Sequence, residues 1–180
     1  MEVSGVFNSC DTFAENSRLK FSRSSFSVTS VMITTAPACS DGKTAKQESA
    51  KKRVQRRCRV TFINAGHNLP FVQKADGEFQ MITAKANMVL GMMEDVPYRE
   101  QYLELSKGDC IYLYTDGVTE ALNPKQELLG DANLTSMLNR HREMAGDADA
   151  FVDAMYDEVD AFADGEMQAD DITMVYLSRK

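Results

Sequence analysis

The sequence predicts an α+β fold, with antiparallel strands and flanking helices sharing one core over residues 59–180. Three observations carry this prediction. From residue 59 onward, short apolar segments with period-two alternation are separated by turn residues, which is typical of antiparallel strands. Two amphipathic helical patterns then follow each other between about residues 131 and 163. A last apolar segment, Ile172–Leu177, is expected to return to the sheet as the final strand.

Residues 1–58 differ from the rest of the chain in composition. Residues 1–40 contain 13 Ser or Thr without a sustained period. The net charge is +6 over residues 1–59 and −13 over residues 60–180. Because so abrupt a change marks a boundary, we expect residues 1–58 to be an irregular or disordered segment, or one foreign to the domain. Residues 59–180 are expected to form the folded portion.

A basic segment, residues 43–59, ends this N-terminal region and holds eight Lys or Arg. Three interpretations stay open. A solvated linker is the usual role of such a run, and a truncated or frameshifted reading frame is another explanation. A nucleic-acid or anionic-membrane patch needs the same charge, but the segment has no aromatic side chains to stack on bases. Nucleic acid is therefore not the expected partner.

The composition also bears on location. No apolar run approaches the roughly 20 residues that a membrane-spanning helix needs. An export signal over Ser27–Cys39 is rejected because Ser and Thr interrupt its apolar core. The four cysteines show no metal-binding or CxxC spacing. Free thiols are typical of a reducing compartment, so the sequence predicts a cytoplasmic protein.

The strands are expected in the following order. Arg59–Asn64 forms the first, and Leu69–Gln73 and Phe79–Ile82 form a hairpin around Asp76-Gly77, a strong turn signal. Alternation of polar and apolar residues then predicts a strand over Tyr98–Leu105.

A turn at Lys107-Gly108-Asp109 leads from that strand into another, Cys110–Thr115. We expect these consecutive strands to pair as a meander. Both are short and bounded by turn residues, as antiparallel neighbours usually are.

Two helices are expected next. The first runs from Asp131 to about Met144, and the second begins at an Asp147 or Asp149 cap and runs to about Ala163. The second helix has an apolar face at spacings of four, four and three residues, formed by Phe151, Met155, Val159 and Phe162. Its opposite face is acidic and is expected to be solvated.

Two acidic motifs stand at the ends of apolar strands. Asp116 follows the run IYLYT, and Asp170-Asp171 precedes the run ITMVYL. Turn or cap aspartates are common at such positions. Carboxylates that converge from two strand ends can also bind a hard divalent cation, which prefers oxygen ligands.

Four motifs occur in a characteristic order and spacing. They are FINAGHNLP at residues 62–70, LGM at 90–92, GDCIYLYTDGVTEALN at 108–123 and DDIT at 170–173. Over residues 59–180 the chain resembles the C-terminal half of a metal-dependent serine/threonine protein phosphatase of the PPM superfamily, in its bacterial SpoIIE/RsbU-like branch. The resemblance implies a partial α-β-β-α sandwich of two antiparallel sheets flanked by helices.

The resemblance also implies a site. Asp116 and Asp170 match metal ligands of the family, which uses two Mn²⁺ or Mg²⁺ ions. The positions that orient ligands or shape loops are Gly117, Asp171, Asn64 and His67. His67 has the chemistry of a general acid, but we favour a loop histidine that holds the Ala65–Asn68 turn.

The implied activity is hydrolysis of phosphoserine or phosphothreonine by a metal-activated water, with a phosphorylated anti-sigma-factor antagonist as substrate. One departure from the family is that its first metal motif, an aspartate pair ahead of the AGHN loop, is not found; nor is the apolar strand pair before that loop. The alternative is therefore a truncated or inactive phosphatase domain that binds a partner. Sheet edges left by a missing half would favour a dimer.

Overall fold

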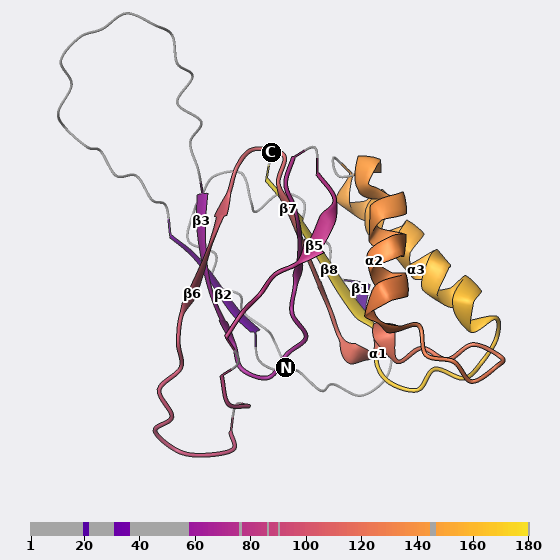
Figure 1. Cartoon of the computed structure of the whole chain (residues 1–180), viewed down its shortest axis with the longest axis horizontal. Helices are drawn as coiled ribbons and strands as arrows, with labels where there is room; N and C mark the ends of the chain where they lie inside the picture. The colour runs from indigo at the N-terminus through magenta and orange to yellow at the C-terminus, as the bar shows by residue number, and fades with distance from the viewer. Residues whose placement is uncertain are drawn as a thin grey trace, which may run out of the picture.

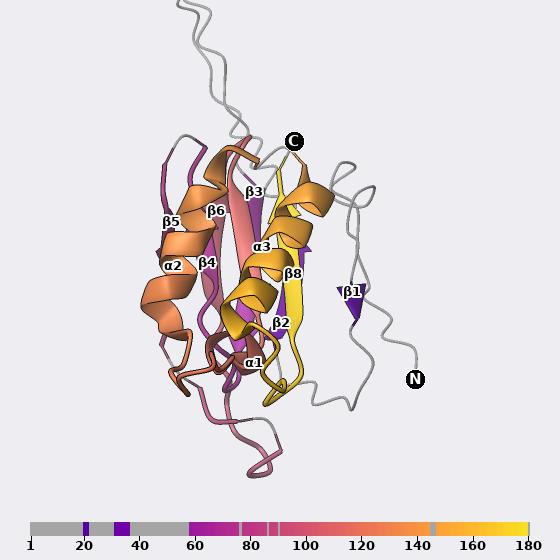
Figure 2. The ribbon, with the colours of Figure 1, turned by 90° about the vertical axis from the view of Figure 1, so that its right-hand side faces the viewer.

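The computed structural model describes most of the chain from residue 58 onward and two short stretches ahead of it. The described residues are 20–21, 31–36, 58–75, 77–85, 87–89, 91–144 and 147–179. Two antiparallel sheets pack face to face, and helices cover the outer face of the larger sheet (Figures 1 and 2). The α+β sandwich predicted from the sequence is confirmed. Within the described residues, no helix is long and apolar enough to cross a membrane.

The larger sheet has five strands in the order β1-β8-β7-β4-β5, and the smaller has three in the order β2-β3-β6. The strands of the larger sheet are β1 (Lys20–Phe21), β4 (Phe71–Gln73), β5 (Phe79–Met81), β7 (Cys110–Tyr114) and β8 (Thr173–Ser178). Those of the smaller sheet are β2 (Val31–Ala36), β3 (Cys58–Asn64) and β6 (Gln101–Leu105). All neighbouring strands are antiparallel.

The helices are α1 (Asp116–Thr119), α2 (Gly130–Arg140) and α3 (Ala148–Ala163), with a 3-10 turn, η1, over Arg142–Met144. The expected helix from Asp131 to Met144 is thus split at its C-terminal end. The α3 helix begins as predicted at Asp147, whose side chain accepts a hydrogen bond from Ala150 N at 3.1 Å. The short helix α1 was not expected.

The hairpin of β4 and β5 is confirmed, with Gly77 N donating to Lys74 O at 2.6 Å across the turn. The predicted meander is wrong, because β6 pairs with β3 and β7 pairs with β4 and β8. The connection at residues 106–109 therefore crosses between the two sheets. Asp109 lies in this connection and anchors it. Its buried carboxylate accepts hydrogen bonds from Ser106 N and Ala75 N, both at 2.9 Å, and so fastens the connection to the β4–β5 turn.

The N-terminal region contains strands that the sequence analysis did not expect. The β2 strand pairs with β3 from Val31↔Asn64 to Ala36↔Arg59, which forms the strand pair ahead of the AGHN loop. The Thr residues that interrupt the apolar run here are themselves good strand formers, so the segment suits a strand better than an export signal. The rest of residues 1–58, including the basic segment up to residue 57, lies outside the described residues, and its nature stays a prediction.

The main core lies between the larger sheet and the helices. Phe151 of α3 is fully buried and stacks on Tyr176 of β8 with ring centroids 4.3 Å apart. Phe79 of β5 packs against the Phe151 ring, with ring centroids 5.5 Å apart. The apolar face predicted for this helix therefore lies on the sheet, and the helix holds β8 and β5 in place from one side.

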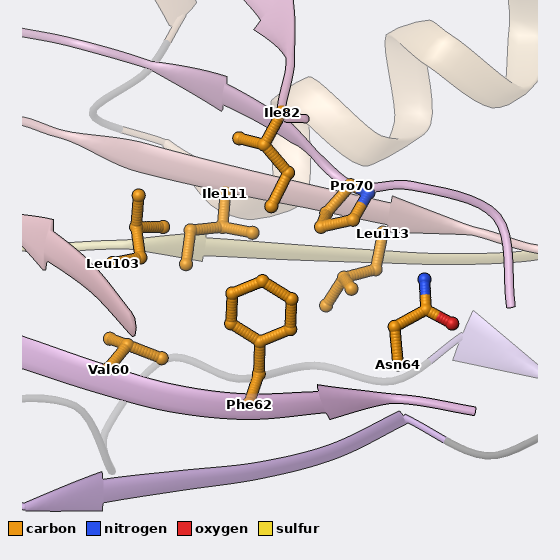
Figure 3. A pocket seen from close by; sticks show the side chains of 8 residues that line it. All are labelled: Val60, Phe62, Asn64, Pro70, Ile82, Leu103, Ile111 and Leu113. Atoms are coloured by element: carbon orange, nitrogen blue, oxygen red, sulfur yellow. The ribbon is translucent and has the colours of Figure 1, made fainter. Parts of the chain in front are cut away.

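A second, smaller core lies between the two sheets. Figure 3 shows Phe62 of β3 facing Ile111 and Leu113 of β7 across a narrow apolar gap. Asn64 stands at one end of this gap, where β3 leads into the AGHN loop (Figure 3). The packing of the sheets therefore fixes where that loop begins.

Candidate metal centre

The two acidic motifs meet at one end of the β7–β8 strand pair. Asp116 lies two residues after the last residue of β7, and Asp170 lies three residues before the first residue of β8. The strands are antiparallel with Tyr114 opposite Met174, so both aspartates emerge at the same edge of the larger sheet. Both side chains are exposed to solvent. A solvent-facing pair of carboxylates at one sheet edge is a suitable start for a cation site.

A threonine hydroxyl ties the two motifs together. Thr115 Oγ1 donates a hydrogen bond to Asp171 O at 2.6 Å and accepts one from Thr173 N at 2.8 Å. The backbone adds a third bond, from Thr115 N to Thr173 O at 3.0 Å. The turn that carries Asp116 is therefore fastened to the loop that carries Asp170.

Gly117 permits a close approach of the same two segments. A Cβ atom at this position would lie 2.6 Å from Asp171 O and 2.8 Å from Asp170 O. Such distances are shorter than van der Waals contact, and the atoms met are backbone atoms. The expected role of Gly117, a backbone that passes close to the site, agrees with this geometry.

The aspartate side chains adopt local conformations. Asp116 Oδ1 accepts a hydrogen bond from Gly117 N at 3.2 Å, and Asp170 Oδ1 accepts one from Asp171 N at 2.6 Å. Gln168 Nε2, two residues earlier in the same loop, donates to Asp170 O at 2.6 Å. Asp171 takes part in the site through its backbone carbonyl group.

The AGHN loop is held by Asn64. Its Oδ1 accepts hydrogen bonds from Gly66 N at 3.1 Å and His67 N at 2.8 Å, and its Nδ2 donates to His67 O at 2.8 Å. Gly66 has a φ of +100°, a conformation that favours glycine. The backbone of His67 thus belongs to the loop's own hydrogen bonds, but the side chain that holds the turn is that of Asn64, and the loop role of His67 stays a prediction.

The charge of Asp116 also acts on the imidazole of His67. Its Nδ1 atom is buried and has no hydrogen-bond partner among the described residues. Burial lowers the pKa of His67, while a backbone hydrogen bond at Asn68 and the negative charge of Asp116 oppose this shift. Burial has the larger effect, so the neutral imidazole is favoured at pH 7.

The donor chemistry fits part of a metal site. Carboxylate oxygens suit Mg²⁺ or Mn²⁺, and Asp116 and Asp170 would hold such an ion. In the described part of the chain, however, no group of three or more His, Cys, Asp or Glu side chains is placed to bind a metal. The residues therefore fit one side of a cation site, and further ligands would have to come from elsewhere.

Sequence reasoning had placed Asp116, Asp170, Gly117 and Asp171 together, and the structure brings all four to one edge. It had not assigned a role to Thr115 or Gln168. Threonine is common in strands because of its β-propensity, so a threonine at the end of a strand does not by itself indicate a role. The usable signal was its position directly before Asp-Gly, where a hydroxyl can replace a backbone group as the strand ends.

Comparison with known proteins places this chain in a family. Residues 54–180 match the family described as stage II sporulation protein E (SpoIIE). This range covers β3, all three helices and both acidic motifs.

Two curated relatives match about two thirds of the chain. Phosphoserine phosphatase RsbU of Bacillus subtilis is 33% identical over 121 residues, which cover 67% of this chain and 35% of that protein. Protein IcfG of Synechocystis sp. is 30% identical over 120 residues, which cover 67% of this chain and 18% of that protein. The chain thus spans about a third or less of the length of these relatives.

The fold has a counterpart among solved structures. The SiaA-PP2C domain of Pseudomonas aeruginosa superposes with a TM-score of 0.56 at 22% identity, covering 68% of this chain and 47% of that one. At this level of identity the likeness concerns the fold, and it agrees with the two-sheet arrangement described above.

Proposed function

The chain belongs to the SpoIIE family of protein serine/threonine phosphatases, and we propose that it is part of a metal-dependent domain that hydrolyses phosphoserine or phosphothreonine in a protein. The observation that carries this proposal is the junction of the two acidic motifs. Thr115 Oγ1 joins the Asp116 turn to the Asp171 carbonyl at 2.6 Å, which brings two exposed carboxylates to one edge.

Each residue of the edge has a role in this proposal. Asp116 and Asp170 hold the cation, while Gly117 and Asp171 set the distance between the segments that carry them. When bound, Mn²⁺ or Mg²⁺ supplies positive charge against the phosphoryl oxygens and lowers the pKa of a water molecule. His67 lies in the loop that Asn64 holds, and the charge of Asp116 acts on its imidazole. The two ions implied by the family need carboxylates from outside the described residues.

The substrate we propose is a phosphorylated anti-sigma-factor antagonist, within a stress or developmental switch. Support comes from the likeness to RsbU, whose name describes a phosphoserine phosphatase. A cytoplasmic setting for this activity stays a proposal, supported by the free thiol of the buried Cys110, which is typical of a reducing compartment. A dimer stays a proposal, based on the edge strands β5 and β6.

Hydrolysis of p-nitrophenyl phosphate by the purified chain, with Mn²⁺ titrated, tests the proposal. We expect Mn²⁺-dependent turnover that Asp116→Asn and Asp170→Asn abolish. The matched control is Asp157→Asn, which makes the same change on the exposed face of α3 and should keep wild-type turnover. Turnover that survives Asp116→Asn, or that needs no metal, would refute the assignment.

A second candidate is an inactive domain that binds a partner. It is favoured by one observation, the lack of a three-ligand group of His, Cys, Asp or Glu in the described part of the chain. Folded protein that shows no turnover at any Mn²⁺ concentration would support this alternative.

A further inference from the structure

We infer that Thr115 is a positioning residue that sets the separation of the Asp116 and Asp170 carboxylates. This inference rests on the proposed function, since it assigns a role toward the cation that those carboxylates would hold. In this role Thr115 contacts neither the substrate nor the cation. It acts through the backbone of the two segments that carry the ligands.

Thr115 continues the β7–β8 strand pair by one residue beyond its last register pair. The last register pair at this end is Tyr114↔Met174, so Thr115 stands opposite Thr173 in the continued register. In a regular antiparallel pair, every second pair of opposite residues exchanges both of its N–H···O bonds, and the bond from Thr115 N to Thr173 O marks this pair as one of that kind. Here one bond is regular, from Thr115 N to Thr173 O, and the other is not.

The second bond is made by the side chain. Thr173 N donates to Thr115 Oγ1 at 2.8 Å, while the Thr115 carbonyl oxygen accepts from Val118 N at 3.1 Å. The hydroxyl thus takes the place of the backbone carbonyl in the strand pair. The carbonyl is thereby available to begin the turn of α1, whose first residue is Asp116.

The Thr115 hydroxyl also donates a hydrogen bond to the segment that carries Asp170. It donates to Asp171 O at 2.6 Å, one residue from Asp170. From the far side of Asp116, Gly117 meets the carbonyl oxygens of residues 170 and 171 with no room for a Cβ atom. Asp116 therefore lies between two contacts that fix its backbone against the Asp170 loop.

Thr115→Val is the discriminating change because it keeps the shape of the side chain and removes the hydroxyl. Two buried or half-buried backbone groups, Thr173 N and Asp171 O, would then lose a partner. Thr115→Ser keeps the hydroxyl and should restore the wild-type behaviour. Thr135→Val is the matched control, since the Thr135 hydroxyl donates to Asp131 O within α2, away from both acidic motifs.

The measurement is Mn²⁺ binding to the full chain by isothermal titration calorimetry, with the thermal unfolding midpoint of each metal-free variant recorded beside it. Loss of a group that orients metal ligands typically weakens affinity about ten- to a hundredfold, and we expect this for Thr115→Val. The Ser variant and the Thr135→Val control should bind Mn²⁺ as the wild type does.

The outcomes separate the two proposals. If wild-type protein binds Mn²⁺ and folded Thr115→Val binds it equally well, the positioning role is overturned and the proposed function stands. A lowered midpoint with unchanged affinity would leave Thr115 a purely structural role and also overturns the inference. If wild-type protein binds no Mn²⁺, the proposed function itself fails, and the positioning role with it. Should Thr115→Val not fold, Thr115→Cys replaces it, and wild-type affinity in that variant overturns the inference.

Discussion

Asp109 offers the sharpest test of what holds the two sheets together. Its carboxylate is 2% exposed and accepts hydrogen bonds from Ser106 N, Ala75 N and Lys74 Nζ, each at 2.9 Å. Asp109→Asn keeps the volume but puts an NH₂ group where one oxygen was, so at least one backbone donor faces another donor. A buried donor left unpaired costs about 1–3 kcal/mol.

The salt bridge and the backbone bonds can be told apart. The Lys74 side chain is 57% exposed, so its pairing with Asp109 should contribute at most about 1 kcal/mol. The backbone bonds to Asp109 are shielded and made to a charged acceptor, so losing them should cost more. We expect Asp109→Asn to lower the free energy of unfolding by about 2–4 kcal/mol and Lys74→Gln by less than about 1 kcal/mol.

The same carboxylate predicts a pH dependence. Burial acts to raise the pKa of Asp109, but the hydrogen bonds from Ser106, Lys74 and Ala75 outweigh it, and the pKa lies below its ordinary value of 3.8. The Asp109 carboxyl group therefore binds a proton more readily in the unfolded protein, where its pKa is higher, than in the folded protein. Its stabilising effect is therefore present above pH 3.8 and is lost as the pH falls through the pKa of the folded state.

Urea unfolding followed by circular dichroism measures both effects, since the chain has no tryptophan. The difference between wild type and Asp109→Asn should be constant near neutral pH and should shrink below about pH 4. The reasoning is refuted if Lys74→Gln costs as much as Asp109→Asn, or if the difference does not change in acid.

Three further substitutions test the site and the core. Gly117→Ala would place a methyl group 2.6 Å from Asp171 O and should weaken Mn²⁺ binding in calorimetry; unchanged affinity would argue against the close approach. Phe151→Ala empties a fully buried position and should cost about 3–5 kcal/mol in urea unfolding, with a loss under 1 kcal/mol contradicting its place in the core. Asp147→Ala removes the cap on Ala150 N and should cost about 1 kcal/mol, whereas Asp147→Asn should cost clearly less.

Local patterns predicted much of this fold because they act over a few residues. The alternation in β6 agrees with exposed Tyr102 and Glu104 beside buried Leu105. The spacing in α3 correctly placed Phe151 and Met155 against the sheet. Hydrophobic periodicity reports which face of an element is buried, and both elements have one clear apolar face.

The pairing of the strands could not be predicted from such local patterns. Two short strands joined by Lys107-Gly108-Asp109 have the sequence signature of a hairpin, yet they lie in different sheets. Each strand pairs with strands of its own sheet, and the carboxylate of Asp109 joins their connection to Ala75, which is 34 residues away. Nothing in the turn itself reveals such a long-range bond. A buried aspartate in a turn can equally serve the turn alone.

In the candidate site, too, local features could be predicted from the sequence and long-range ones could not. The positions of Asp116 and Asp170 at strand ends were readable, and so was the need for Gly117. The role of Thr115 depends on register, because its hydroxyl matters only when Thr173 lies opposite it. Register is set by the packing of both sheet faces and is therefore a property of the whole fold.

Under the proposed function, metal binding and hydrolysis at this edge can be tested separately. Asp116 and Asp170 come from the ends of one strand pair, and the bonds of Thr115 join them without help from the smaller sheet. Under the proposed function, two carboxylates would hold one cation once β7 and β8 are paired, whereas the proposed two-ion chemistry would need ligands beyond these two aspartates. Mn²⁺ binding without turnover would favour the partner-binding alternative. Turnover would instead require that a carboxylate from outside the described residues completes the site.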